Sequence, residues 1–156
     1  MRKWMTVITL LAVVACGDTV STANTQASGN TTDIASTGSF GADLNAFRAA
    51  QGRGAVTTNR LLQRAAQAHA EDMVRNDYFA HRSPNGAEMS DRIAASGYRA
   101  CWAAENIAWG QETAAVVFAG WRGSDGHRRN MLGEAYVDYG LGHFGDNWVL
   151  LLAKGC

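Results

Sequence analysis

Residues 136–156 read YVDYGLGHFGDNWVLLLAKGC, and this stretch decides the fold class. Its first half alternates apolar residues with small or polar ones, and its second half holds a continuous apolar run. Asp146 and Asn147 supply turn residues between the halves. Two strands joined by a tight turn form an antiparallel hairpin, and a strand with no polar alternation is buried on both faces. The stretch therefore predicts such a hairpin.

The residues before this hairpin show helical periodicity. In the strongest segment, 58–77, a Thr-Asn pair caps one apolar stripe that is made of Leu62, Ala65, Ala66, His69 and Met73. Weaker helical patterns cover 41–52, 86–97 and 113–121. Helices followed by strands indicate an α+β domain. His69 lies inside the stripe, where a histidine is more often a hydrogen-bonded core residue than a ligand.

The N-terminal sequence MRKWMTVITLLAVVAC indicates export. Arg2 and Lys3 precede an apolar run over 4–15, which is too short to span a bilayer, and this order is typical of a secretory signal. The run ends at Cys16, and Val-Val-Ala-Cys resembles the bacterial lipobox, in which the cysteine is lipidated. We therefore predict a signal peptide over 1–16 and a lipid anchor at Cys16, which would hold the protein to a membrane of the cell envelope. The alternative is an ordinary signal peptide with an incidental cysteine.

Composition divides the remaining chain into a tether and a domain. Residues 17–38 are rich in Ser, Thr, Asn and Gly and show no period, which predicts a disordered tether. Residues 39–156 are long enough for one domain with a core of its own. The sequence holds 14 basic and 14 acidic side chains, and its densest basic cluster is Arg128 and Arg129 beside His127. Nucleic acid is therefore not an expected partner.

Two cysteines remain once Cys16 is assigned to the lipid. In an oxidising compartment, Cys101 and Cys156 are most simply a disulfide, which would pin the C-terminus. Free thiols, an intermolecular bridge and a metal ligand are the alternatives.

Five ordered motifs carry a resemblance to a known family. These motifs are LLQRAAQAHAEDMVRNDYFAHRSPNG, RIAASGY, AENIAWG, WRGSDGHRRNML and YGLGHFGDNWVLLLA. Together they resemble the CAP superfamily, also called SCP-like, and in particular its bacterial extracytoplasmic branch. The resemblance runs from about Leu44 to the end of the chain. It implies an α-β-α sandwich, in which helices flank a small antiparallel sheet and a central cleft is lined by histidines and acids.

The resemblance places the residues of this cleft at His81, Glu105 and His127. A second glutamate of the fuller eukaryotic pattern is missing, and Ser124 stands nearest its place. The missing acid weakens the case for an acid pair in general acid–base catalysis.

Two imidazoles and one carboxylate form the minimum set for an open divalent-metal site. His81, Glu105 and His127 are therefore candidate ligands, and zinc is the metal that nitrogen-rich ligation favours. The alternative is a structural network, in which the same side chains tie loops to the sheet through hydrogen bonds. The residues alone leave both readings open.

Ser124 precedes the helix-starting sequence Asp-Gly-His. We expect its hydroxyl to cap this helix rather than to act as a nucleophile with His127 as base, because no Gly-x-Ser-x-Gly elbow surrounds it. A histidine in the first turn of a helix is unfavourably placed for positive charge, so we expect His127 to be neutral and to face the cleft.

Three functions follow. The one we favour is a lipid-anchored envelope module that binds a lipid, a peptide, another small ligand or a divalent metal in its cleft. A metal-dependent hydrolase or peptidase, with Glu105 and His127 as catalytic residues, is the second. An interaction protein with a vestigial cleft is the third. The missing acid favours binding over catalysis, and the sequence does not indicate an oligomeric state.

Overall fold

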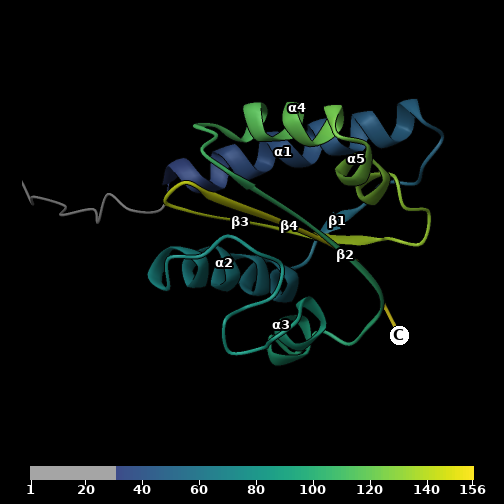
Figure 1. The fold of residues 1–156 in the computed structure, drawn as a ribbon. Coiled ribbons are helices and arrows are strands. Elements are labelled where there is room, and N and C mark those ends of the chain that lie inside the picture. Colours follow the sequence, from purple (N-terminus) through teal and green to yellow (C-terminus); the bar gives the residue numbers. More distant parts are fainter. Residues whose placement is uncertain (1–30) are drawn as a thin grey trace, which may run out of the picture.

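The structure is a computed structural model that describes residues 31–156, with side chains from residue 39 onward. Its elements are α1 (Thr31–Ala50), β1 (Thr57–Thr58), α2 (Arg60–Arg75), α3 (Met89–Ala95), β2 (Ala100–Trp109), α4 (Ala114–Gly123), α5 (Asp125–Met131), β3 (Asp138–Phe144) and β4 (Asn147–Gly155). Helices α1, α4 and α5 lie on one face of the sheet, and α2 and α3 lie on the other (Figure 1). The predicted α+β class and the α-β-α sandwich are confirmed.

The sheet has the strand order β1-β3-β4-β2. Strand β4 pairs antiparallel with both β2 and β3, so the three long strands form the expected antiparallel sheet. The short β1 pairs parallel with β3, which makes the sheet mixed rather than wholly antiparallel. Strand β2 is an outer strand, and the candidate site lies along it.

The packing of strand β4 explains why its sequence is continuously apolar over 148–153. Its alternate side chains enter two different cores, because successive residues of a strand point to opposite faces. Leu150 and Leu152 pack with the buried residues of α1 and α4. Val149 and Leu151 pack with those of α2 and α3. The predicted hairpin is confirmed, but its turn is formed by Gly145 and Asp146 rather than by Asp146 and Asn147, because Asn147 is the first residue of β4.

Two glycines of β3 allow α2 to lie directly on the sheet. A Cβ at Gly140 would collide with the backbone of Leu62 and Gln63, and one at Gly142 would collide with the backbone of Ala66. The predicted apolar stripe of α2 is buried against this surface. The small residues in YGLG therefore set the distance between helix and sheet.

The disulfide joins Cys101 in β2 to Cys156 after β4, with the two Cα atoms 4.9 Å apart. Beside it, the Cys156 amide donates to the carbonyl oxygen of Arg99 at 3.0 Å. The predicted intramolecular bridge is confirmed, and it fixes the C-terminus to the outer strand.

One boundary predicted from the sequence needs correction, and one strand was not predicted. Helix α1 begins at Thr31, so 31–38 are helical and do not belong to the tether predicted over 17–38. Composition misled there, because a Ser/Thr-rich segment can continue a helix that is held by packing further along. The sequence pattern also indicated no strand over 100–109, because AENIAWG lacks a clear alternation.

Some predictions lie outside the described residues. They are the signal peptide over 1–16, the lipid anchor at Cys16 and the tether over 17–30. Within 31–156, no helix combines the length and the apolar character that crossing a membrane requires.

Gly140→Ala is expected to lower the free energy of unfolding by about 1 to 3 kcal/mol, because the added methyl group meets helix backbone that cannot move aside easily. Urea unfolding measures the change. Gly123→Ala is the matched control: a Cβ there meets nothing within 4 Å, so the effect should stay within about 0.5 kcal/mol. Equal stability of the two variants would show that α2 does not rest on β3 in this way.

Candidate functional site

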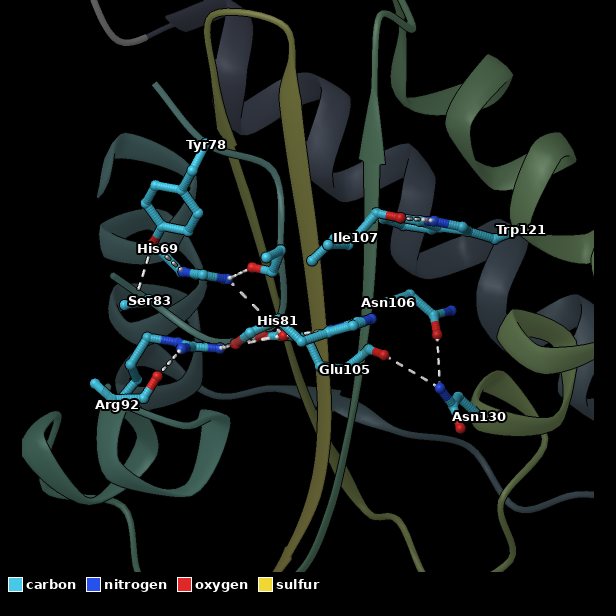
Figure 2. Close-up of polar contacts among 12 residues, drawn as sticks. His69, Tyr78, His81, Ser83, Arg92, Glu105, Asn106, Ile107, Trp121 and Asn130 are labelled. Carbon is cyan, nitrogen blue, oxygen red and sulfur yellow. Dashed lines mark hydrogen bonds and ion pairs between the residues drawn. The ribbon is translucent and has the colours of Figure 1, made fainter. Parts of the chain in front are cut away.

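Glu105 lies in the middle of β2 and points toward α2 and α3 (Figure 2). Its side chain is only 3% exposed. Arg92 Nη2 donates to both carboxylate oxygens, at 3.1 Å to Oε1 and 2.9 Å to Oε2. His81 Nδ1 lies 2.8 Å from Oε1. A buried carboxylate is tolerated only when it is paired and hydrogen-bonded, and these two side chains meet that requirement.

Arg92 also holds the loop between α2 and α3. Its Nη2 donates to the carbonyl oxygen of His81 at 2.8 Å, and its Nη1 donates to that of Ala87 at 3.1 Å. The guanidinium therefore fixes the backbone that carries His81 as well as the carboxylate that His81 contacts.

His69 is fully buried behind this pair. Its Nε2 donates to the carbonyl oxygen of Ala80 at 3.1 Å and lies 3.9 Å from Glu105 Oε1. Its Nδ1 lies 3.4 Å from the Tyr78 hydroxyl. Burial lowers the pKa of His69. The expectation of a hydrogen-bonded core histidine is confirmed, and the structure adds that this core residue lies beside Glu105.

The other side of β2 carries α5. Asn106 Nδ2 donates to the carbonyl oxygen of His127 at 3.1 Å. Asn130 Nδ2 donates to Asn106 Oδ1 at 2.8 Å and to the carbonyl oxygen of Glu105 at 3.1 Å (Figure 2). Trp121 Nε1 donates to the carbonyl oxygen of Ile107 at 3.3 Å. Side chains from α4 and α5 thus satisfy the outward carbonyl groups of this outer strand, and they place His127 next to it.

His127 is the third residue of α5. Burial, and then the nearby charge of His81, lower its pKa. Its ring packs edge-on against that of Trp121, with centroids 6.4 Å apart. The imidazole is therefore neutral at pH 7, as its place in the first turn of a helix suggested.

Ser124 is the N-cap of α5, but its side chain makes no capping hydrogen bond, so the predicted role of its hydroxyl is wrong. The same residue also ends α4, and its backbone serves both helices: its N–H donates to the carbonyl oxygen of Trp121, and its own carbonyl oxygen accepts from the N–H of Arg128. Asp125 lies in the first turn of α5, where its negative charge interacts favourably with the positive end of the helix dipole.

Glu105, Arg92 and His81 form what we call the Glu105 cluster. A cavity of about 960 Å³ opens beside it. Its lining residues include Tyr78, Ile107, Trp121, Ser124 and His127. Val74, Phe79 and Trp109 also line it, and they are 40%, 49% and 63% exposed. The volume lies within the range of small-molecule sites, and apolar walls are typical of such sites.

The four residues predicted for the cleft fall into two groups. His81 and Glu105 are in direct contact, but they are not among the lining residues of the cavity. Ser124 and His127 line the cavity, and His127 lies close enough to His81 for the charge of His81 to lower its pKa. The catalytic and ligand-binding roles assigned to these residues stay predictions.

The arrangement does not fit the proposed zinc ligands. Both oxygens of Glu105 accept hydrogen bonds from Arg92, and a guanidinium at that distance opposes a second cation. Across the described part of the chain, no group of three or more His, Cys, Asp and Glu side chains could hold a metal ion. Ser124 and His127 both line the cavity, and the side chain of Ser124 makes no capping hydrogen bond to α5.

Sequence reasoning missed Arg92, Asn106 and Asn130. Arg92 begins the motif RIAASGY, and Asn106 follows Glu105 directly. A usable signal existed for Arg92, because a carboxylate expected in a buried strand requires a cationic or hydrogen-bonding partner. The asparagines gave no comparable signal, because their role depends on how α5 lies along the strand.

Comparison with known proteins places this arrangement among relatives. The family model CAP, the cysteine-rich secretory protein family, matches residues 42–147. The uncharacterized protein YkwD of Bacillus subtilis is 35% identical over 99 residues, which are 64% of this chain and 38% of that protein. The chain thus spans about two fifths of the length of this curated relative.

Two solved structures share the fold. An extracellular protein containing a SCP domain from Bacillus anthracis aligns with a TM-score of 0.73 and 26% identity, over 75% of this chain and 39% of that chain. An outer surface protein from Borrelia burgdorferi aligns with a TM-score of 0.71 and 17% identity, over 78% of this chain and 94% of that chain.

The free energy of unfolding is expected to fall as the pH drops from about 7 to about 5. Burial lowers the pKa of His69 and of His127 below the ordinary value of 6.5, so the unfolded chain takes up protons at a higher pH than the folded chain. This contribution to stability is complete above about pH 6.5 and is lost as the pH falls through the folded-state pKa values. Urea unfolding at the two pH values measures it.

His127→Gln should remove part of this pH dependence. Asp72 does not contribute to the difference between pH 7 and pH 5, because the hydrogen bond from Tyr78 lowers the pKa of its carboxyl below the ordinary 3.8. An unfolding free energy that is the same at both pH values would contradict the neutral state of the two histidines.

Proposed function

The chain belongs to the CAP family of cysteine-rich secretory proteins, in its bacterial extracellular type, and on this premise we propose that it is an envelope binding module. Its cavity beside His127 takes a small, largely apolar ligand. The observation that carries the proposal is the cavity of about 960 Å³, which has aromatic residues in its wall and at its mouth. A soluble domain rarely leaves large apolar side chains exposed around a hollow unless the hollow binds something.

Export and anchoring complete the proposal. The relatives of known structure are named as extracellular and outer surface proteins. The signal-like residues 1–16 and the lipobox-like Cys16 agree with an exported protein that is held to a membrane by a lipid. A lipid anchor would keep the cavity within reach of envelope components.

Binding is favoured over hydrolysis by the state of the polar groups. The carboxylate of Glu105 is hydrogen-bonded to Arg92 and His81. His127 is neutral, but within the described chain no nucleophile is hydrogen-bonded to its ring. The cluster therefore acts as a support for the wall of the cavity. His127 and Tyr78 offer the cavity polar atoms that can orient a ligand.

A neutral apolar dye, Nile red, is expected to bind in the cavity with a saturable increase in fluorescence. Gly120→Phe should weaken binding by about tenfold or more, because Gly120 lines the cavity and a Cβ there meets nothing within 4 Å, so the ring can occupy the hollow. Gly123→Phe, near the end of the same helix and outside the lining, is the matched control and should bind like the wild type.

Dye binding that is non-saturable, or equal in the two variants, would refute the cavity as the binding site. A zinc titration of the wild type by thermal unfolding gives the second arm. A zinc-dependent rise in Tm that His81→Ala abolishes would favour the metal reading of the cluster over the structural one.

A further inference from the structure

The charged groups that line the cavity are of one sign. Asp77 and Asp146 are its carboxylates, and both lie exposed at its surface. Its lining includes neither lysine nor arginine, and His127 is neutral. Within the described part of the chain, no ion pair engages either aspartate. An anionic ligand would therefore find no counter-charge in this cavity, whereas a cation would find two.

Two buried amide groups in the same cavity have acceptor atoms without donors. Asn147 is 5% exposed, and its Oδ1 has no hydrogen-bond partner. Gln111 Oε1 is buried without a partner as well. Both residues line the cavity. Buried acceptors are almost always satisfied, so each of these two oxygens calls for a donor, which a bound water or a ligand can bring.

The acids and the amides lie at one end of the sheet. The Gly110 N–H donates to the carbonyl oxygen of Asp146 at 2.9 Å, and Trp148 Nε1 donates to that of Gln111 at 2.8 Å. The β3–β4 turn and the loop from β2 to α4 lie side by side at that end (Figure 1). Val74 lies against this turn, because a Cβ at Gly145 would lie 3.2 Å from its Cγ2.

Asp77 joins this end of the sheet through the chain that follows α2. Its N–H donates to the carbonyl oxygen of Val74 at 3.4 Å. Its φ of 52° lies in the left-handed region, which turns the chain sharply before Tyr78 and Phe79. The exposed rings of Phe79 and Trp109 line the same cavity as the two aspartates.

We propose that the cavity selects a primary ammonium group carried on an apolar or aromatic body. The inference rests on the proposed function, since it names the class of ligand for the same cavity. The ammonium would lie between Asp77 and Asp146, with aromatic faces near it that also attract cations. Its N–H groups would reach the amide oxygens of Gln111 and Asn147. The apolar body would fill the space toward Trp121 and Ile107.

Displacement of Nile red from the whole mature protein tests this inference with four probes that share a phenethyl body. Phenethylamine is the primary ammonium, phenethyl alcohol is its neutral analogue, 3-phenylpropionate is its anionic analogue, and trimethyl(phenethyl)ammonium is a cation without N–H donors. We expect phenethylamine to bind about tenfold more tightly than the alcohol and the anion to bind most weakly. The trimethyl compound should bind less tightly than phenethylamine, and added salt should reduce the preference for cations.

Substitutions test which side chains cause the preference for phenethylamine over the alcohol. Asp77→Asn and Asp146→Asn should each reduce the preference for phenethylamine over the alcohol by several-fold. Gln111→Leu should weaken the amine more than the alcohol. Asp43→Asn is the matched control, because Asp43 is an exposed aspartate on α1 outside the cavity. It should leave the preference unchanged.

Equal binding of the amine and the alcohol would overturn the inference and leave the proposed function standing. Equal binding of phenethylamine and the trimethyl compound would overturn the assignment of a primary amine. Loss of preference in Asp43→Asn to the same extent as in Asp77→Asn would show that only the overall charge matters, which also overturns it. Failure of Nile red itself to bind would overturn the proposed function.

Discussion

The buried carboxylate of Glu105 is the constraint on which the rest of the site depends. A charge at this depth must be neutralised by partners that the local strand cannot supply. Arg92 comes from α3, and His81 comes from the loop before it. The need to pair one side chain thereby fixes a helix and a loop against β2. Tyr78 and Phe79, which form part of the cavity wall, belong to that same loop.

The backbone of β2 imposes a second requirement. An outer strand exposes carbonyl groups that invite pairing with another strand. Here the carbonyl oxygens of Glu105 and Ile107 accept from the side chains of Asn130 and Trp121. Helices α4 and α5 therefore cover the edge of β2 at which a further strand would otherwise pair. Their position brings His127 to the cavity. The two faces of β2 thus share one site, with the polar cluster on one side and the cavity reaching the other.

Much of this fold could be predicted from the sequence, because the signals were local. The apolar run of β4 reflects a strand that is buried on both faces, and the stripe of α2 reflects burial that recurs with the helical period. Strand β2 could not be found in this way, because its buried residues include Glu105 and Asn106, which are polar. The boundary at residue 38 failed for a related reason, because composition does not report how far a packed helix continues.

The candidate site was less predictable than the fold. The sequence pointed to His81, Glu105 and His127, and their types alone were equally suitable for a metal and for a structural network. Arg92 bears on that choice, and its role depends on the way α3 lies over the sheet. Ser124 ends α4 and begins α5, and its hydroxyl does not make the predicted capping hydrogen bond. Such features arise from tertiary contacts that no window of sequence contains.

The most direct test of this account is a double-mutant cycle between Glu105 and Arg92, read as the free energy of unfolding in urea. Glu105→Gln and Arg92→Met should each lower it by about 3 kcal/mol, because each strands a buried partner. The double variant should lose clearly less than the sum of the two, with a coupling of at least about 1.5 kcal/mol. If each single variant loses less than about 0.5 kcal/mol of unfolding free energy, and the double variant loses the sum of the two, the claim that this pair holds the wall of the cavity is contradicted.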